Sequence, residues 1–519
     1  MTLKQYILAL ASSAALLGMA GCKKQLEEVK PETTLDPTQV LADPSSAFAL
    51  YNGVYNTFRG YQSTFFVLGE MRSETWANGL FTESGDGGLT QFWMHNFNEA
   101  NAPYNNWAGF YGLLSRINTV IKLFPQAPLT EADKNRYRGE MFGMRAYVYY
   151  TMLRTWGAVP LATEPLEKIG ELSALYKHRT SADSIMLQIR SDIDSSLALI
   201  GPNVSYSTPS NPNNNKRVYW NRAATLTLKG DAYIWAATHM GGGSSDLQTA
   251  KTALEEVKNN TAFFALQNNF GDVFDPLKKN NNREIIFAIN FEKDQAGLGS
   301  YGNFTVNSTQ RASLIFDPPP GAPVSIVSVY PYVSGANRVG MTADLINTLT
   351  TSVPADKRMA STFRTMHNNS APYALRGIML TKFLGRADPI SSSQIYDSDF
   401  PVYRYADVLL LLAEAKAKLN EDPSEEINAI RLRAYGTGFL PMVNGSLTEN
   451  LDAILEEYKR EFIGEGRYWW AMRRAGDSFV YARVNPGFLD PSVAYKMLLP
   501  ITVSMLNSDP KLSQTPGYN

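Results

Sequence analysis

The chain has 519 residues, of which 44% are hydrophobic and 19% are charged, and its 48 basic and 49 acidic side chains leave a net charge of -1. This is the composition of a globular protein with ample apolar material for a large core. The near-neutral charge and the absence of a long basic run give no electrostatic basis for binding nucleic acid.

The first residues are typical of a bacterial lipoprotein signal peptide. Lys4 gives a short positive start, and the apolar stretch of residues 6–20 is too short to span a bilayer comfortably. It ends in Leu17-Gly18-Met19-Ala20-Gly21-Cys22, which looks like a lipobox, although Met19 stands where leucine is more usual. Cys22 is the single cysteine of the chain, so a disulfide or a CxxC zinc site cannot form. We predict a signal peptide over residues 1–21 and lipid on Cys22; the alternative is a plain secretory signal with a chance cysteine.

Residues 22–43 are expected to form an extended polar tether behind the lipid. A helical body follows over residues 44–519, because apolar residues recur there at the spacing of one helix face. Antiparallel helix pairs of this length resemble tetratricopeptide units, although no strict repeat is visible. The sequence therefore predicts a mainly α fold with few short strands, such as residues 285–289. The predicted helices span residues 47–58, 107–121, 131–156, 181–199, 221–238, 245–259, 403–419, 425–434 and 451–474.

Three segments interrupt this pattern and are predicted to be large irregular loops on a single body. They are residues 65–106, 205–216 and 293–337, which are rich in Gly, Asn, Ser, Pro and aromatic residues. Long loops on a rigid scaffold frequently carry binding residues. No linker divides the body into separate domains.

The sequence offers little support for an enzyme. The four histidines, His95, His178, His239 and His367, lack metal-ligand spacing. The HExxH, GxSxG, Walker A and EF-hand patterns are absent. Acidic pairs such as Glu456 and Glu457 are expected on solvated helix faces rather than in a glycosidase site. We predict a protein without catalytic residues, cofactor or metal.

Several motifs, taken in chain order, resemble the SusD/RagB family of lipoproteins, and together they cover nearly the whole mature chain. They are mostly structural, and we expect Arg145, Arg404, Glu414 and Arg431 to be paired at helix interfaces. The motifs are Arg145-Ala146-Tyr147 with Trp156-Gly157-Ala158-Val159-Pro160-Leu161, Arg179-Thr180-Ser181 with residues 189–197, Asn282-Arg283-Glu284-Ile285-Ile286-Phe287-Ala288, Tyr403-Arg404-Tyr405-Ala406-Asp407-Val408-Leu409-Leu410 with Ala413-Glu414-Ala415, residues 428–433, Leu499-Pro500-Ile501 and Gln514-Thr515-Pro516-Gly517-Tyr518.

The chain departs from the family pattern near its end. Tyr458, Tyr468 and Ala471 stand where the family usually has Arg, Arg and Asp. This difference predicts that a local ion-pair network is missing there.

The resemblance implies a cell-surface lipoprotein of the outer membrane that captures a glycan and delivers it to a SusC-like TonB-dependent transporter. A peptide-importing, RagB-like member of the same family is the main alternative, and a helical-repeat adaptor for proteins is a weaker one. A sugar ring suits a flat aromatic side chain on its apolar face and polar side chains at its rim.

Candidate ligand-binding residues come from two irregular regions where the family places its contacts. The alternative for each aromatic residue is that it pins its loop to the scaffold. The candidates are Glu74, Trp76, Asn78, Phe81, Trp93 and Tyr104 in the first region, and Tyr301, Tyr330 and Tyr332 in the second, with Trp76 and Trp93 favoured.

Overall fold

The computed structural model describes residues 41–80, 88–166, 172–202, 217–280, 282–351, 355–484 and 487–518. The predicted signal peptide, Cys22, most of the tether and the loop of residues 205–216 lie outside these ranges. The fold is mainly helical, with 53% helix and 9% strand, as the sequence predicts.

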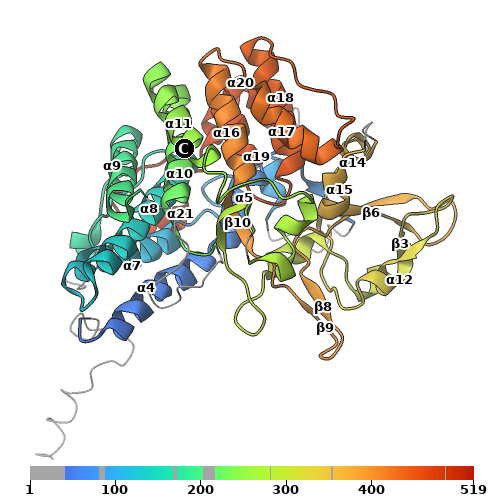
Figure 1. Cartoon of the computed structure of the whole chain (residues 1–519), viewed down its shortest axis with the longest axis horizontal. Coiled ribbons are helices and arrows are strands. Elements are labelled where there is room, and N and C mark those ends of the chain that lie inside the picture. Colours follow the sequence, from blue (N-terminus) through green and yellow to red (C-terminus); the bar gives the residue numbers. More distant parts are fainter. Residues whose placement is uncertain are drawn as a thin grey trace, which may run out of the picture.

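The N-terminal half is a set of long antiparallel helices, drawn in blue to green in Figure 1. Helix α8 packs along α9, and α10 packs along α11. Side chains of Thr130, Ser181 and Asn221 accept hydrogen bonds from backbone N–H groups in the first turns of α8, α9 and α10, which explains where these helices start. The helices are α4 (Pro44–Arg59), α5 (Gln62–Glu70), α7 (Ala108–Leu123), α8 (Glu131–Trp156), α9 (Ala182–Ile200), α10 (Arg222–His239) and α11 (Gly243–Lys258).

The C-terminal helices pack beside α10 and α11, with α16 against both. The predicted single helix over residues 451–474 is wrong, because the chain turns between α18 and α19. Gly464 and Gly466 have φ of +84° and +73° there, a conformation that other residues rarely adopt. The helices are α16 (Tyr405–Lys418), α17 (Ser424–Tyr435), α18 (Leu447–Glu461), α19 (Tyr468–Ala475), α20 (Asp477–Arg483) and α21 (Val503–Ser508).

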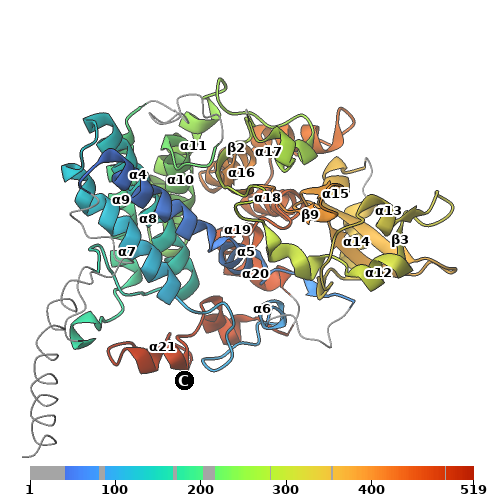
Figure 2. The same ribbon diagram turned by 90° about the horizontal axis from the view of Figure 1, so that it is seen from below.

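A sheet-containing region lies at one end of the molecule, to the right in Figures 1 and 2. Its four strands run in the order β4-β3-β6-β7, and they cover a small apolar core of their own around Phe316, Met366 and Met379. The predicted loop of residues 293–337 is therefore partly regular. The strands are β3 (Leu314–Phe316), β4 (Val324–Ser325), β6 (Phe363–Asn368) and β7 (Leu375–Leu380), with the short helices α12 (Ser308–Ser313), α13 (Ile326–Val329), α14 (Ala343–Thr350) and α15 (Lys357–Thr362) beside them.

Three two-stranded pairings complete the fold. The predicted strand β2 (Ile285–Ile289) is confirmed, and it pairs antiparallel with β10 (Phe400–Arg404). Strand β8 (Arg386–Asp388) pairs with β9 (Ser393–Ile395), and β1 (Ala77–Asn78) pairs with β5 (Val339–Gly340). The last pairing positions the site described below.

The structure contains a buried ion cluster around Arg404, which is more extensive than the helix-interface pairing that the sequence predicts. Arg404, with no exposed surface, donates from Nη1 to Glu284 and Glu461 at 2.7 Å each, and from Nε to Glu465 at 2.8 Å. Lys382 donates to Glu465 at 2.8 Å. The cluster comprises Arg358, Lys382, Arg404 and Arg433 with Glu284, Asp356, Glu457, Glu461 and Glu465.

The prediction that a local ion-pair network is missing near the end of the chain is wrong, because Glu461, Glu465 and Arg474 of this segment all form ion pairs. At two of the substituted positions the contacts are made by tyrosine hydroxyls. The Tyr458 hydroxyl accepts from Arg474 at 3.1 Å, and the Tyr468 hydroxyl donates to Glu74 at 2.8 Å. Neutral hydroxyl partners thus serve where charged ones were expected. The predicted helix-interface pairing is confirmed for Arg145 with Asp192, Arg404 with its three carboxylates, Glu414 with Arg474, and Arg431 with Glu457.

Candidate functional site

Two segments that are far apart in the sequence meet at the pairing of β1 with β5. Ala77 lies opposite Gly340, and Asn78 lies opposite Val339. The N–H of Gly79 donates to the carbonyl of Arg338 at 3.0 Å, which extends the pairing. We call residues 74–80 and 335–340 the β1–β5 junction. It joins both regions in which the sequence placed candidate binding residues.

Glu70, at the end of α5, fixes the junction from the protein interior. Its fully buried carboxylate accepts from the indole Nε1 of Trp76 at 3.1 Å and from the backbone N–H groups of Gly464 and Gly466 at 2.7 Å each. Burial raises the pKa of Glu70 to about 7, although the two backbone N–H groups oppose the shift. These bonds attach the start of the junction to the turn between α18 and α19.

Three of the predicted aromatic contacts are buried. The exposed fraction is 0% for Trp76, and 4% for Trp93 and for Tyr301. The rings of Trp76 and Phe304 lie 4.8 Å apart, and the ring of Tyr301 stacks on Phe383 at 4.9 Å. These side chains present no ring face to solvent in this conformation, and Trp76 and Tyr301 both pack against Phe304 in the interior.

Besides Glu74, four predicted residues keep part of their side chain in solvent. Of these, Asn78 belongs to the junction, and Tyr332 precedes it by three residues. Tyr104 and Tyr330 each lie edge-on to a buried phenylalanine outside the junction. Phe81 lies outside the described residues. The four are Asn78, Tyr104, Tyr330 and Tyr332.

Glu74 lies at the edge of the junction, with 20% of its side chain exposed. One carboxylate oxygen accepts from the Tyr468 hydroxyl at 2.8 Å, while the other has no hydrogen-bond partner. Burial raises the pKa of Glu74, and Lys459, 4.0 Å away, counteracts part of this rise. The unpaired oxygen is itself buried, so in this conformation Glu74 offers no exposed acceptor at the junction.

Arg338 is a candidate contact that the sequence analysis missed. It is partly exposed, and its Nε has no hydrogen-bond partner. Its backbone is fixed, because its N–H donates to the carbonyl of Asn303 at 2.8 Å and its carbonyl accepts from Gly79. Nothing in the local sequence distinguishes it from other surface arginines; only the strand pairing brings it next to Asn78.

His95 supports the polypeptide that follows the short helix α6 (Thr90–Trp93). Its Nε2 lies 3.0 Å from the carbonyl of Arg72 and its Nδ1 lies 3.3 Å from the Arg72 guanidinium. This arrangement suits a neutral ring with the proton on Nε2. Burial and the neighbouring guanidinium hold the pKa of His95 well below its usual value.

We expect this histidine to make the protein less stable in mild acid. Below about pH 6.5 the unfolded chain binds a proton at His95 that the folded chain does not, so the free energy of unfolding falls as pH falls. Chemical denaturation at pH 7 and pH 5 measures this loss. The variant His95→Gln, which keeps one donor and one acceptor, should lose less stability over that interval, and an equal loss in both proteins would contradict the assignment.

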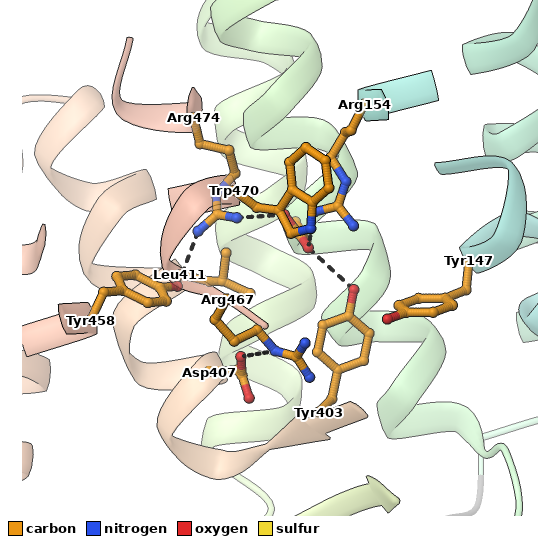
Figure 3. A pocket seen from close by; sticks show the side chains of 10 residues that line it. Tyr147, Arg154, Tyr403, Asp407, Leu411, Tyr458, Arg467, Trp470 and Arg474 are labelled. Carbon is orange, nitrogen blue, oxygen red and sulfur yellow. Dashed lines mark hydrogen bonds and ion pairs between the residues drawn. The ribbon is translucent and has the colours of Figure 1, made fainter. Parts of the chain in front are cut away.

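A small internal cavity near the centre of the helical body is too small to be a ligand site. Figure 3 shows Arg154, Arg474 and Tyr403 extending toward one another beside it. Arg474 and Tyr403 bond to Asp231 at 2.9 and 3.2 Å. The cavity volume of about 10 Å³ holds about one water molecule. Its lining thus belongs to the scaffold.

The described part of the chain offers neither a cluster of metal-ligating side chains nor a membrane-spanning helix. Within it, no three His, Cys, Asp or Glu side chains gather in a way that could hold a metal ion. None of the helices described has both the length and the apolar character needed to cross a membrane.

Comparison with known proteins gives a consistent result along the whole chain. The family profile described as "SusD family" matches residues 355–518, and one described as "Starch-binding associating with outer membrane" matches residues 26–226. SusD-like protein P38 of Formosa agariphila is 23% identical over an alignment of 550 positions that covers 97% of this chain and 97% of its own. The solved structure of B. fragilis NanU is 31% identical and covers 95% of this chain and 100% of its own, with a TM-score of 0.82. A laminarin-binding SusD-like protein has the same fold, with a TM-score of 0.69 at 21% identity over 92% of this chain and 100% of its own.

Proposed function

The chain belongs to the SusD family, and on that premise we propose that it binds a glycan at the cell surface and passes it to a SusC-like TonB-dependent transporter in the outer membrane. Capture involves no bond cleavage. The lipid on Cys22 holds the protein at the membrane, and residues 23–43 give it reach. The profile over residues 26–226 supports this assignment, since its description names starch binding and the outer membrane.

The observation that carries the proposal is the pairing of β1 with β5. It brings the partly exposed side chains of Asn78 and Arg338 onto neighbouring strands, with Glu74 at the edge of the same junction and the buried rings of Trp76 and Phe304 inside it. An amide and a guanidinium together donate to and accept from the hydroxyl groups of a sugar. Tyr332, three residues away, offers a partly exposed ring for the apolar face of the sugar.

A binding screen tests this function. The body from residue 23 onward is run in native gels that contain neutral or acidic polysaccharides, and peptides are tested by calorimetry. Retardation by a glycan with no product released supports the proposal. Binding of peptides alone would replace it with the peptide-importing alternative, and turnover of a glycan would show an enzyme.

We expect Arg338→Ala to weaken binding of the retained glycan by about tenfold, because a charge-assisted hydrogen bond to a sugar oxygen is lost. The change should leave folding intact, since the guanidinium Nε of Arg338 has no protein partner. Gel retardation at several glycan concentrations gives the dissociation constant. Arg222→Ala, a surface arginine paired with Glu256 on the helix pair α10 and α11, is the matched control and should bind like the wild type. Equal affinity of Arg338→Ala and the control would remove Arg338 from the site.

A further inference from the structure

A second, separate groove lies where α4 ends and α5 begins. It has a volume of about 410 Å³ and opens to solvent between Arg59 and Gln62 on one side and the loop of residues 291–300 on the other. Gln295 and Ser300 line it from that loop, which turns through Gly297 and Gly299. None of the candidate residues from the sequence analysis lines this groove.

The start of α5 gives the groove a positive character. No side chain caps this helix, and the N–H groups of residues 62–64 donate to no acceptor among the described residues. Uncapped N–H groups and the helix dipole together favour an anion at a helix N-terminus. Gln62 and Ser63 both belong to this first turn and to the groove lining.

The side chain of Arg59 adds to the preference of the groove for an anion. Arg59 donates to the carbonyl of Asn290 at 3.3 Å and to the side chain of Asn56, both neutral acceptors, and no ion pair of Arg59 with a described carboxylate is present. Arg59 is the single charged residue that lines the groove among the residues described. Glu292 and Asp294 belong to the same loop but do not line the groove, and Glu292 lies 3.6 Å from Lys279.

Gln62 is the second, independent sign of a ligand. It is only 3% exposed, its Oε1 accepts from the Ser300 hydroxyl at 2.6 Å, and its Nε2 has no hydrogen-bond partner. The Ser300 hydroxyl can donate or accept, so the oxygen and nitrogen of the Gln62 amide could exchange places. In that orientation the amide nitrogen would bond to Ser300 and the amide oxygen would be the atom without a partner. The amide also neighbours the hydroxyl of Tyr301, which already donates to the carbonyl of Gly464. A buried amide left without a partner is costly unless a ligand completes it.

We propose that this groove binds an anionic group, a carboxylate or a sulfate, carried by the glycan. Arg59 and the first N–H groups of α5 hold the anion, and the free polar atom of Gln62 bonds to it or to a neighbouring hydroxyl. This inference rests on the proposed function and narrows its ligand class to acidic glycans.

The test compares three probes, polygalacturonate, dextran sulfate and neutral dextran, by gel retardation of the body from residue 23 onward. The wild type should bind at least one anionic probe at least tenfold more tightly than dextran. Whether polygalacturonate or dextran sulfate binds distinguishes a carboxylate from a sulfate. Arg59→Gln should reduce that affinity at least tenfold, while Arg222→Gln, which removes the same charge elsewhere, should not.

A second variant separates binding from folding. Ser63→Asp places a carboxylate in the first turn of α5, where it favours the helix and occupies the place of the anion. It should melt at or above the wild-type temperature and still lose the anionic probe. The inference would be overturned if the wild type bound none of the anionic probes, or if Arg59→Gln and Ser63→Asp both bound them with unchanged affinity. Binding of a neutral glycan in that case would leave the proposed function standing. If neither neutral nor acidic glycans bind in the wider screen, the proposed function itself fails.

Discussion

Arg404→Ala is expected to lose about 3–5 kcal/mol of folding stability or to yield no folded protein. Arg404 is completely buried and bonds to three carboxylates, so its removal leaves Glu284, Glu461 and Glu465 with less positive charge in the interior. Burial alone would raise the pKa of Glu461, but Arg433 and Arg404 hold it well below its usual range. Without Arg404 these carboxylates must either remain charged in a poorly compensated site or take up protons.

Urea denaturation followed by circular dichroism measures this effect. Lys278→Ala is the control, because Lys278 forms an ion pair with Asp272 while 52% of its side chain is exposed. Exposed ion pairs contribute little to folding stability, so the control should unfold at the same urea concentration as the wild type. If Arg404→Ala also unfolds with the wild type, the cluster does not hold the C-terminal helices to β2 and β10.

Gly69→Ala is expected to cost about 1–3 kcal/mol or more, because a methyl group does not fit between α5 and the turn before α19. A Cβ at Gly69 would lie 2.0 Å from the carbonyl oxygen of Gly466 and 2.9 Å from the indole nitrogen of Trp470. The first neighbour is backbone and cannot rotate away. The shift would also disturb the bonds that Glu70 makes to Gly464 and Gly466, and with them the β1–β5 junction.

Gly53→Ala, in the interior of α4, is the matched control. A Cβ at Gly53 meets nothing within 4 Å, so alanine should stabilise the helix by about 0.5–1 kcal/mol. Thermal melts of both variants measure the contrast. A melting temperature for Gly69→Ala at or above that of Gly53→Ala would show that α5 does not approach the turn as closely as described.

The helices were largely predictable from the sequence because their signals are local. The predicted helix over residues 131–156 agrees with α8 at both ends, since Thr130 caps its start and Gly157 follows its end with φ of +71°. The helix predicted over residues 451–474 failed because an amphipathic pattern continues on both sides of a turn. Gly464 and Gly466 were visible in the sequence, but their left-handed conformation depends on packing against α5.

The candidate site was predictable by region more than by residue. The sequence placed binding residues in two irregular regions, and β1 with β5 connects them. The sequence could not separate exposed from buried side chains. Trp76 and Asn78 occur in the same short motif, and only the hydrogen bond of Trp76 to Glu70 shows that Trp76 faces inward. Arg338 and the groove beside Arg59 depend on pairings between distant segments, which no local pattern reports.

Hydrogen exchange of the body with and without the retained glycan shows whether the glycan binds at the β1–β5 junction. Backbone amides of residues 74–80 and 335–340 should exchange more slowly when the glycan is bound. For an acidic glycan, residues 62–64 at the start of α5 should be protected as well. Unchanged exchange in these segments, with protection confined to the helices α8 to α11, would instead place the ligand on the helical scaffold and rule out binding at the junction.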